Sequence, residues 1–179
     1  QGAADHWLAS GTAGYWQILH DLPEDEAKRP QALADALARQ NVLLLATLAR
    51  EADLPAQAAE RSYTRYAPYR VARVKGTFAL HQLRLQLGTQ PFLKLMRTVH
   101  ERFQGRTIAT ADFVLVAKEV TGRDLSPLLQ PWLERTGFPA ALGVPMVLEG
   151  QPIAAIPVAR PEAEFFSDKQ VELLKTFAS

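Results

Sequence analysis

Apolar residues at helical spacing, interrupted repeatedly by glycine and proline, constrain the fold of this chain most. Phe92, Met96, Val99 and Phe103 recur every three to four residues in a segment with a glycine on each side. Such a stripe is typical of an amphipathic helix that buries one face. Similar stripes recur along the first three quarters of the chain. We therefore predict a mainly α-helical fold, in which short helices form a bundle or a superhelix.

The ends of the helices are predicted from residues that start or stop a helix. Thr89 and Thr110 are placed to cap helices, and Gly88 and Gly122 are placed to end them. The stretch 62–74 is rich in Tyr and Arg and is expected to be a loop. The expected helices cover residues 7–19, 30–51, 75–87, 89–105, 112–120 and 126–137.

The pattern changes after residue 140. The apolar runs 142–148 and 152–159 flank a Glu-Gly turn signal, and together they predict a C-terminal β-hairpin. Ser167 and Gln170 form a capping box, so a closing helix is expected to start at Asp168.

The change of pattern also suggests how the chain is organised. Its 179 residues allow one domain, or one domain and a fragment. We predict a helical domain over residues 1–140 and a fragment of two strands and a helix over residues 141–179.

Composition excludes several kinds of partner and chemistry. With 20 Lys and Arg against 19 Asp and Glu, the net charge of +1 gives no reason to expect nucleic acid as a partner. Every apolar run, residues 42–45 among them, is far shorter than the ~20 residues that cross a bilayer, so no membrane contact is expected. The chain has no cysteine, which excludes disulfides and thiol catalysis. Its first residues lack the features of a signal peptide, so a soluble protein is expected, cytoplasmic rather than secreted.

Three motifs between residues 7 and 139 resemble the catalytic region of the gluzincin zinc aminopeptidases, the aminopeptidase N family. Residues 7–15 are similar to the family's Trp-Leu-Asn-Glu-Gly-Phe-Ala-x-Tyr segment. Residues 74–88 are similar to its Lys-Gly segment with the Leu-Arg and Leu-Gly pairs that follow. Residues 110–139 are similar to the run that ends its catalytic domain. The resemblance implies that residues 7–139 correspond to the C-terminal part of that catalytic region.

The residues that perform the family's chemistry are missing from these motifs. The family binds zinc through two His and a Glu, and a His-Glu-x-x-His helix supplies the His pair and the general base. This sequence has no such motif. Ser10 stands where the third ligand is expected, and Arg73 stands where the family has its transition-state-stabilising Tyr. We therefore expect no metal ligands and no cofactor, although the resemblance would imply zinc.

The tail, residues 142–178, resembles the end of GAF sensory domains. The resemblance rests on residues 143–160, with their Glu-Gly turn, and on residues 166–178. Such modules bind small ligands in a pocket over an antiparallel sheet. Only the last two strands and the closing helix of such a domain would be present, and the exposed edge of a hairpin suggests a homodimer through the hairpin and helix.

Two groups of residues are candidates for a functional site. Ser10 is a candidate for a nucleophile, with His6 or His20 as base and Asp5 or Asp21 as orienting carboxylate, although no sequence spacing requires a triad. The second group lies in the stretch rich in Tyr and Arg, where guanidinium groups could hold a peptide or a small carboxylate. Its members are Tyr69, Arg70, Arg73 and Lys75. A metal site at His81 and His100 with Glu101 or Glu119 is the less favoured reading of two helical histidines.

Three functions remain open from the sequence. The first, which we favour, is a degenerate metallopeptidase-like scaffold that acts as a binding or structural module without zinc peptidase activity. The second is a hydrolase with a different site around Ser10 and its His and Asp partners. The third is a GAF-like fragment for sensing or dimerisation.

Overall fold

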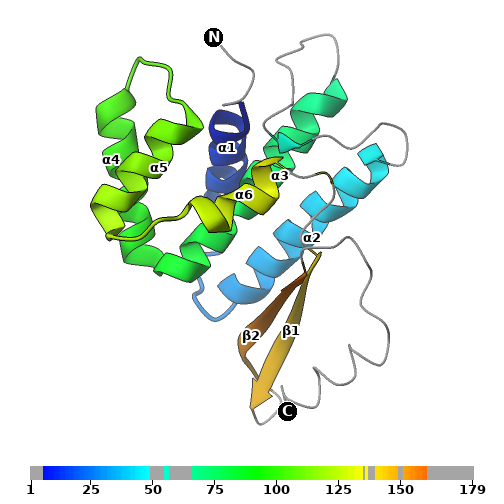
Figure 1. The fold of residues 1–179 in the computed structure, drawn as a ribbon. Helices are drawn as coiled ribbons and strands as arrows, with labels where there is room; N and C mark the ends of the chain where they lie inside the picture. Colours follow the sequence, from blue (N-terminus) through cyan, green and yellow to red (C-terminus); the bar gives the residue numbers. More distant parts are fainter. Residues whose placement is uncertain are drawn as a thin grey trace. The chain divides into compact units, whose positions relative to one another are not determined.

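The computed structural model describes residues 6–48, 55–56, 66–134, 136, 140–148 and 151–160. The chain divides into two compact units, Gln1–Thr136 and Gly137–Ser179. The described part of the first unit is helical, which confirms the prediction of a mainly α-helical chain (Figure 1). The division falls a few residues before the domain boundary that the sequence suggested.

The described residues of the first unit form six α-helices. They are α1 (His6–His20), α2 (Arg29–Leu48), α3 (Tyr66–Leu87), α4 (Thr89–Phe103), α5 (Thr110–Thr121) and α6 (Ser126–Glu134). In Figure 1, α3 runs through the unit, with α1 and α2 beside its first half and α4 and α5 at its far end. Among these helices, α1 and α3 share the most extensive contact.

Two glycines let the backbones of α1 and α3 come together. A Cβ atom on Gly11 would lie 2.6 Å from the carbonyl carbon of Gly76, and one on Gly76 would lie 2.4 Å from the carbonyl oxygen of Trp7. Both distances are far below van der Waals contact with backbone atoms that cannot rotate away. The glycines that weaken α1 as an isolated helix are therefore what allows it to pack.

The core of the first unit is built around aromatic side chains of α1. Trp7 is fully buried, lies edge-on to the ring of Phe113 at 6.1 Å, and donates a hydrogen bond from Nε1 to Oγ1 of Thr110 at 2.9 Å. Tyr15, two turns further along α1, is 1 % exposed and lies edge-on to Phe92 of α4. One helix thus anchors both α4 and α5.

The predicted threonine caps are wrong in position. Gly88 and Ala109 are the N-cap residues of α4 and α5, and Thr89 and Thr110 are already helical. The Thr110 hydroxyl instead accepts the hydrogen bond from Trp7. At α5, the Asp112 carboxylate accepts a hydrogen bond from the Ala109 backbone N–H at 3.0 Å, so a residue inside the first turn caps the helix.

The predicted loop at residues 62–74 is also wrong in its second half, because α3 already begins at Tyr66. Val71, Ala72 and Val74 are at most 1 % exposed, so burial of this face stabilises two further helical turns. Pro68 lies in the first turn, where a missing backbone N–H breaks no helical hydrogen bond.

In the second unit, β1 (Ala140–Leu148) and β2 (Gln151–Arg160) pair as antiparallel strands where the sequence predicts a hairpin. Leu142 pairs with Val158, and the register shifts between Met146 and Val147. The predicted closing helix from Asp168 lies outside the described residues.

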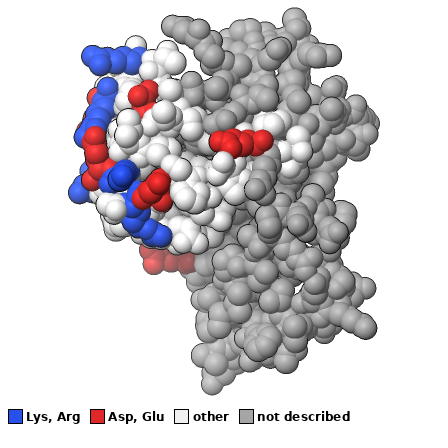
Figure 2. Space-filling model, in the orientation of Figure 1, with Lys and Arg blue, Asp and Glu red and all other residues white. Residues whose placement is uncertain are grey.

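The described surface carries both signs of charge. Figure 2 shows basic and acidic side chains side by side over α4 and α5, as the near-zero net charge leads one to expect. Arg102 of α4 and Glu119 of α5 form an ion pair there. Within the described ranges, no helix is long and apolar enough to cross a membrane.

Candidate functional site

Ser10 lies inside α1 and its hydroxyl is engaged within that helix. The side chain is 5 % exposed, and Oγ donates a hydrogen bond to the backbone carbonyl of His6 at 2.7 Å. This contact to the preceding turn is a common arrangement for a helical serine. The hydroxyl proton is therefore directed at a backbone oxygen, and not at a side-chain base.

The predicted partners of Ser10 are not brought together around it. The His6 ring lies against the ring of Tyr69, with centroids 5.1 Å apart. His20 is the last residue of α1, and Asp21 follows it. Ten residues of helix separate Ser10 from His20, which corresponds to about 15 Å along the axis. The described geometry thus contains no Ser-His-Asp triad, and the alternative carboxylate, Asp5, lies outside the described residues.

The four candidates of the Tyr- and Arg-rich stretch lie on α3 and have different neighbours. Arg73 donates from Nη2 to Oε1 of Gln17 on α1 at 2.9 Å, while Arg70 donates from Nη1 to Oγ1 of Thr47 on α2 at 3.3 Å. Tyr69 packs on His6, and Lys75 is fully buried. Tyr69, Arg70 and Arg73 were predicted to share one loop, with Lys75 directly after it. The helix separates them because it turns each residue by about 100° from the one before.

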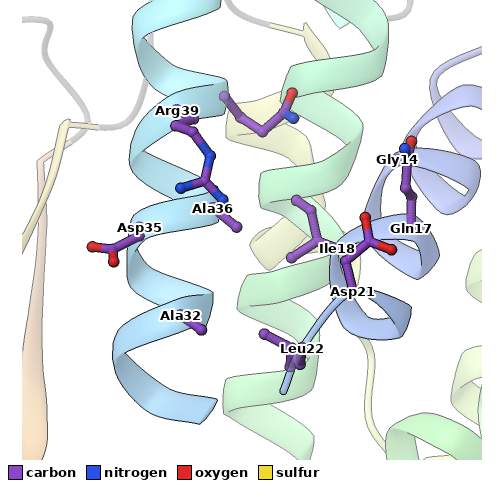
Figure 3. A pocket seen from close by; sticks show the side chains of 10 residues that line it. Gly14, Gln17, Ile18, Asp21, Leu22, Ala32, Asp35, Ala36 and Arg39 are labelled. Atoms are coloured by element: carbon purple, nitrogen blue, oxygen red, sulfur yellow. The ribbon is translucent and has the colours of Figure 1, made fainter. Parts of the chain in front are cut away.

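A groove of about 350 Å³ lies between α1 and α2 (Figure 3). Its apolar wall comes from the side chains of Ile18, Leu22, Ala32 and Ala36. Its polar lining is formed by Gln17, Asp21, Asp35, Arg39 and Gln40. Of these, only Asp21 was a candidate from the sequence, where it was considered as a partner of Ser10.

A polar cluster that the sequence did not indicate joins α1 to α3. The Tyr15 hydroxyl and His81 Nδ1 are 3.0 Å apart and hydrogen bonded. Burial, together with the smaller effect of the nearby positive charge of Arg84, lowers the pKa of His81 to about 4. Burial raises the pKa of Tyr15, while Arg84 opposes that shift. The pair is 66 residues apart in sequence, so only the crossing of the two helices reveals it.

Arg84 completes this cluster. Its Nε donates to Oγ1 of Thr89 at 3.3 Å, and its Nη1 is buried without a hydrogen-bond partner in the described structure. A guanidinium beside His81 favours the neutral imidazole, which keeps the cluster at a single positive charge near neutral pH.

The two positions that the aminopeptidase resemblance relates to zinc chemistry carry side chains that do not suit a zinc ion. Ser10 offers a hydroxyl whose proton already goes to His6, and a neutral hydroxyl is a poor zinc ligand beside a carboxylate. Arg73 offers a cation, which repels a metal ion. Over the described residues, no three His, Cys, Asp or Glu side chains gather closely enough to hold a metal. The predicted histidine site is dispersed: His81 pairs with Tyr15 and Glu119 with Arg102.

Comparison with known proteins finds similarity to zinc peptidases. The curated aminopeptidase N of Lactococcus lactis subsp. lactis is 30% identical over 69 residues, which is 38% of this chain and 8% of that enzyme. A mutant of a two-domain M1 zinc metallopeptidase, solved with L-tryptophan, aligns with a TM-score of 0.56 and 26% identity over 77% of this chain. The M1 zinc metallopeptidase of Deinococcus radiodurans aligns with a TM-score of 0.56 and 25% identity over 86% of this chain.

The chain is much shorter than these relatives. It spans 29% and 31% of the two metallopeptidase structures and 8% of the aminopeptidase. The resemblance to the aminopeptidase family is confirmed, and it concerns a part of each relative.

The second resemblance is confirmed over a wider range than the motifs indicated. The sequence model of the GAF domain matches residues 31–179, whereas the motifs pointed to residues 142–178. The GAF match covers residues 31–179, and the metallopeptidase alignment covers 77% of the chain. The two matches therefore overlap within the first unit. The chain belongs to the GAF domain family, and its fold is similar to that of part of the M1 zinc metallopeptidases.

Proposed function

We propose that the first unit, Gln1–Thr136, is a metallopeptidase-like scaffold that acts as a binding or structural module, without zinc peptidase activity of its own. The observation that carries this proposal is the hydrogen bond from Ser10 Oγ to the His6 carbonyl. The position that would hold a metal-binding carboxylate holds instead a buried hydroxyl, engaged in its own helix.

Arg73 supports the same proposal, because it stands where the resemblance would place the family's transition-state-stabilising Tyr. A phenol there would stabilise an oxyanion through its O–H group. The Arg73 guanidinium instead bonds to Gln17 and connects α3 to the far end of α1. The interaction stabilises the arrangement of the two helices, so the residue at this position has a structural use.

Metal analysis and a peptidase assay test the proposal together. We expect no stoichiometric zinc in protein purified without chelator, and no hydrolysis of aminoacyl anilides with or without added zinc. Ser10→Ala serves as the matched variant: its fold should persist, and any slow nitrophenyl ester hydrolysis should be unchanged. Zinc-dependent anilide cleavage would overturn the proposal. Ester hydrolysis that disappears in Ser10→Ala would favour the serine hydrolase instead.

A second role is favoured by the GAF match over residues 31–179. We propose that the hairpin of β1 and β2 takes part in self-association, as a fragment of a sensory domain would. Among the described residues, each strand of this sheet pairs with one neighbour, and an open strand edge can accept a further strand.

Light scattering over a range of protein concentrations tests self-association. We expect a dimer whose fraction rises with concentration, and a weaker dimer in Ile156→Lys, because a charge on a strand opposes edge pairing. Leu115→Lys, an exposed position on α5, is the control and should leave association unchanged. A monomer at every concentration would contradict this role.

A further inference from the structure

Opposite charges come from the two sides of the groove between α1 and α2. The two helices run in opposite directions, with Arg39 on α2 and Asp21 directly after α1. Figure 3 shows the Arg39 guanidinium extending toward Ala36 and the Asp21 carboxylate extending beside Ile18, so the two charges lie across the groove from each other. The groove therefore has a positive side and a negative side.

Neither of these two charges is neutralised by the other. The described structure contains no ion pair between Asp21 and Arg39, and both side chains are exposed. Asp35, the remaining carboxylate of the lining, accepts a hydrogen bond from Gln31 of its own helix at 2.8 Å, and Figure 3 shows it turned away from the groove. Asp21 and Arg39 are thus the charges available to a ligand.

A second guanidinium lies near the groove. Arg73 reaches over from α3 to Gln17, and a Cβ atom on Gly14 would lie 3.3 Å from its Nε. Both Gly14 and Gln17 line the groove. An anion held by Arg39 would therefore also experience the field of Arg73 at longer range.

The lining between the two charges is apolar. Ile18 of α1 and Leu22, which follows that helix, face Ala32 and Ala36 of α2. The volume of about 350 Å³ lies at the lower end of the range for small-molecule sites. A fitting ligand is therefore small, has an apolar middle, and carries its charges at opposite ends.

We propose that this groove binds a linear zwitterion whose ammonium and carboxylate are separated by a short hydrocarbon chain. The carboxylate lies against Arg39, the ammonium against Asp21, and the methylene chain on Ile18 and Ala36. An α-amino acid, in which the two charges are adjacent, matches only one side of the groove at a time. The inference goes beyond the proposed function, because that function names no ligand and no groove.

Calorimetric titration of the full chain with 6-aminohexanoate tests the site, with its isomer norleucine as the matched ligand. Norleucine has the same atoms, but its two charges share one carbon. We expect 6-aminohexanoate to bind about fivefold more tightly than norleucine, hexanoate or hexylamine, the fold-change of one weakly screened ion pair. Equal or tighter binding of norleucine, or no measurable binding of 6-aminohexanoate, would overturn the proposal.

Substitutions in the groove provide the second measurement. Arg39→Gln should weaken 6-aminohexanoate to the affinity of hexylamine, and Asp21→Asn should weaken it to that of hexanoate. Both positions are exposed, so the fold should tolerate the changes. Arg97→Gln and Glu101→Gln, exposed on α4, are controls that should bind as the unmodified chain does. Binding that survives both groove substitutions would also refute the site.

The proposed ligand site and the proposed function can be refuted independently of each other. Since the probe contains no peptide bond, zinc-dependent anilide cleavage would overturn the proposed function and leave this binding result unaffected. Conversely, a chain that has no peptidase activity and does not bind 6-aminohexanoate would refute only the proposed ligand site in the groove.

Discussion

The Tyr15 hydroxyl and His81 Nδ1 lie 3.0 Å apart, and this hydrogen bond connects α1 to α3 on the side of their crossing that faces α4. The two rings also meet edge-on, with centroids 5.7 Å apart. Because the site is largely buried and Arg84 is close, the pKa of His81 falls to about 4. The imidazole in this contact is therefore neutral near pH 7.

This contact predicts that the protein loses stability in weak acid. The unfolded chain binds a proton at His81 near the ordinary pKa of 6.5, whereas the folded chain binds it only near pH 4. The unfolded state thus holds more protons between these values, and stability falls as the pH drops through them. The full loss should be up to about 3 kcal/mol. Urea unfolding at pH 7.5 and at pH 4.5 measures it.

Two variants separate this effect from general acid sensitivity. His81→Asn should flatten the fall in stability between pH 7.5 and pH 4.5, since the titrating group is gone. His100→Gln, at an exposed position of α4, should keep the fall unchanged. An equally steep fall in His81→Asn would assign the acid sensitivity to other groups.

The contact between the backbones of α1 and α3 makes a second prediction. Gly76→Ala would place a methyl group 2.4 Å from the Trp7 carbonyl oxygen, so the helices must move apart. We expect a loss of about 2 kcal/mol in the free energy of unfolding, even though Ala favours a helix over Gly by ~1 kcal/mol. Ala13→Ser, on the exposed side of α1, should change stability by less than about 0.5 kcal/mol. A Gly76→Ala protein as stable as the original would show that the crossing is looser than described.

The sequence predicted helices well where an apolar stripe and a terminal signal agree. The stripe from Phe92 to Phe103 and the left-handed Gly122 that ends α5 are examples. It missed the first turns of α3, because Tyr, Arg and Pro near 66–70 have weak local preferences there. Burial of Val71 and Val74 against other helices stabilises those turns, and that energy comes from residues distant in sequence.

The candidate sites were harder to predict for a related reason. Residue types suggested a group of Arg, Lys and Tyr, yet a helix of known pitch turns Arg70 toward Thr47 and Arg73 toward Gln17. The prediction that these charged side chains gather in one place assumed that residues 62–74 form a loop. The Tyr15–His81 bond and the groove beside Asp21 arise from the relative placement of two helices, for which a single sequence contains no local signal.

The start of α5 makes a third prediction. The Asp112 carboxylate accepts the hydrogen bond of the Ala109 N–H, one of the backbone donors that a helix leaves unpaired at its start. Asp112→Ala should lower the free energy of unfolding by about 1 kcal/mol, and Asp112→Asn by less, because its amide oxygen still accepts. Chemical denaturation measures both. Equal losses in the two variants would mean that the charge at the helix end, and not the hydrogen bond, is what matters.

The indole of Trp7 makes the last prediction. Trp7 is fully buried and donates to the Thr110 hydroxyl, so Thr110→Val keeps the shape of the side chain but removes the acceptor. A buried donor without a partner costs about 1–3 kcal/mol, and we expect a loss in that range from urea unfolding. Thr110→Ser retains the hydroxyl and should lose less, although it gives up a methyl group. Thr107→Val, at an exposed position before α5, should be nearly neutral. If Thr110→Val were as stable as Thr110→Ser, the hydrogen bond would not contribute to joining α1 and α5.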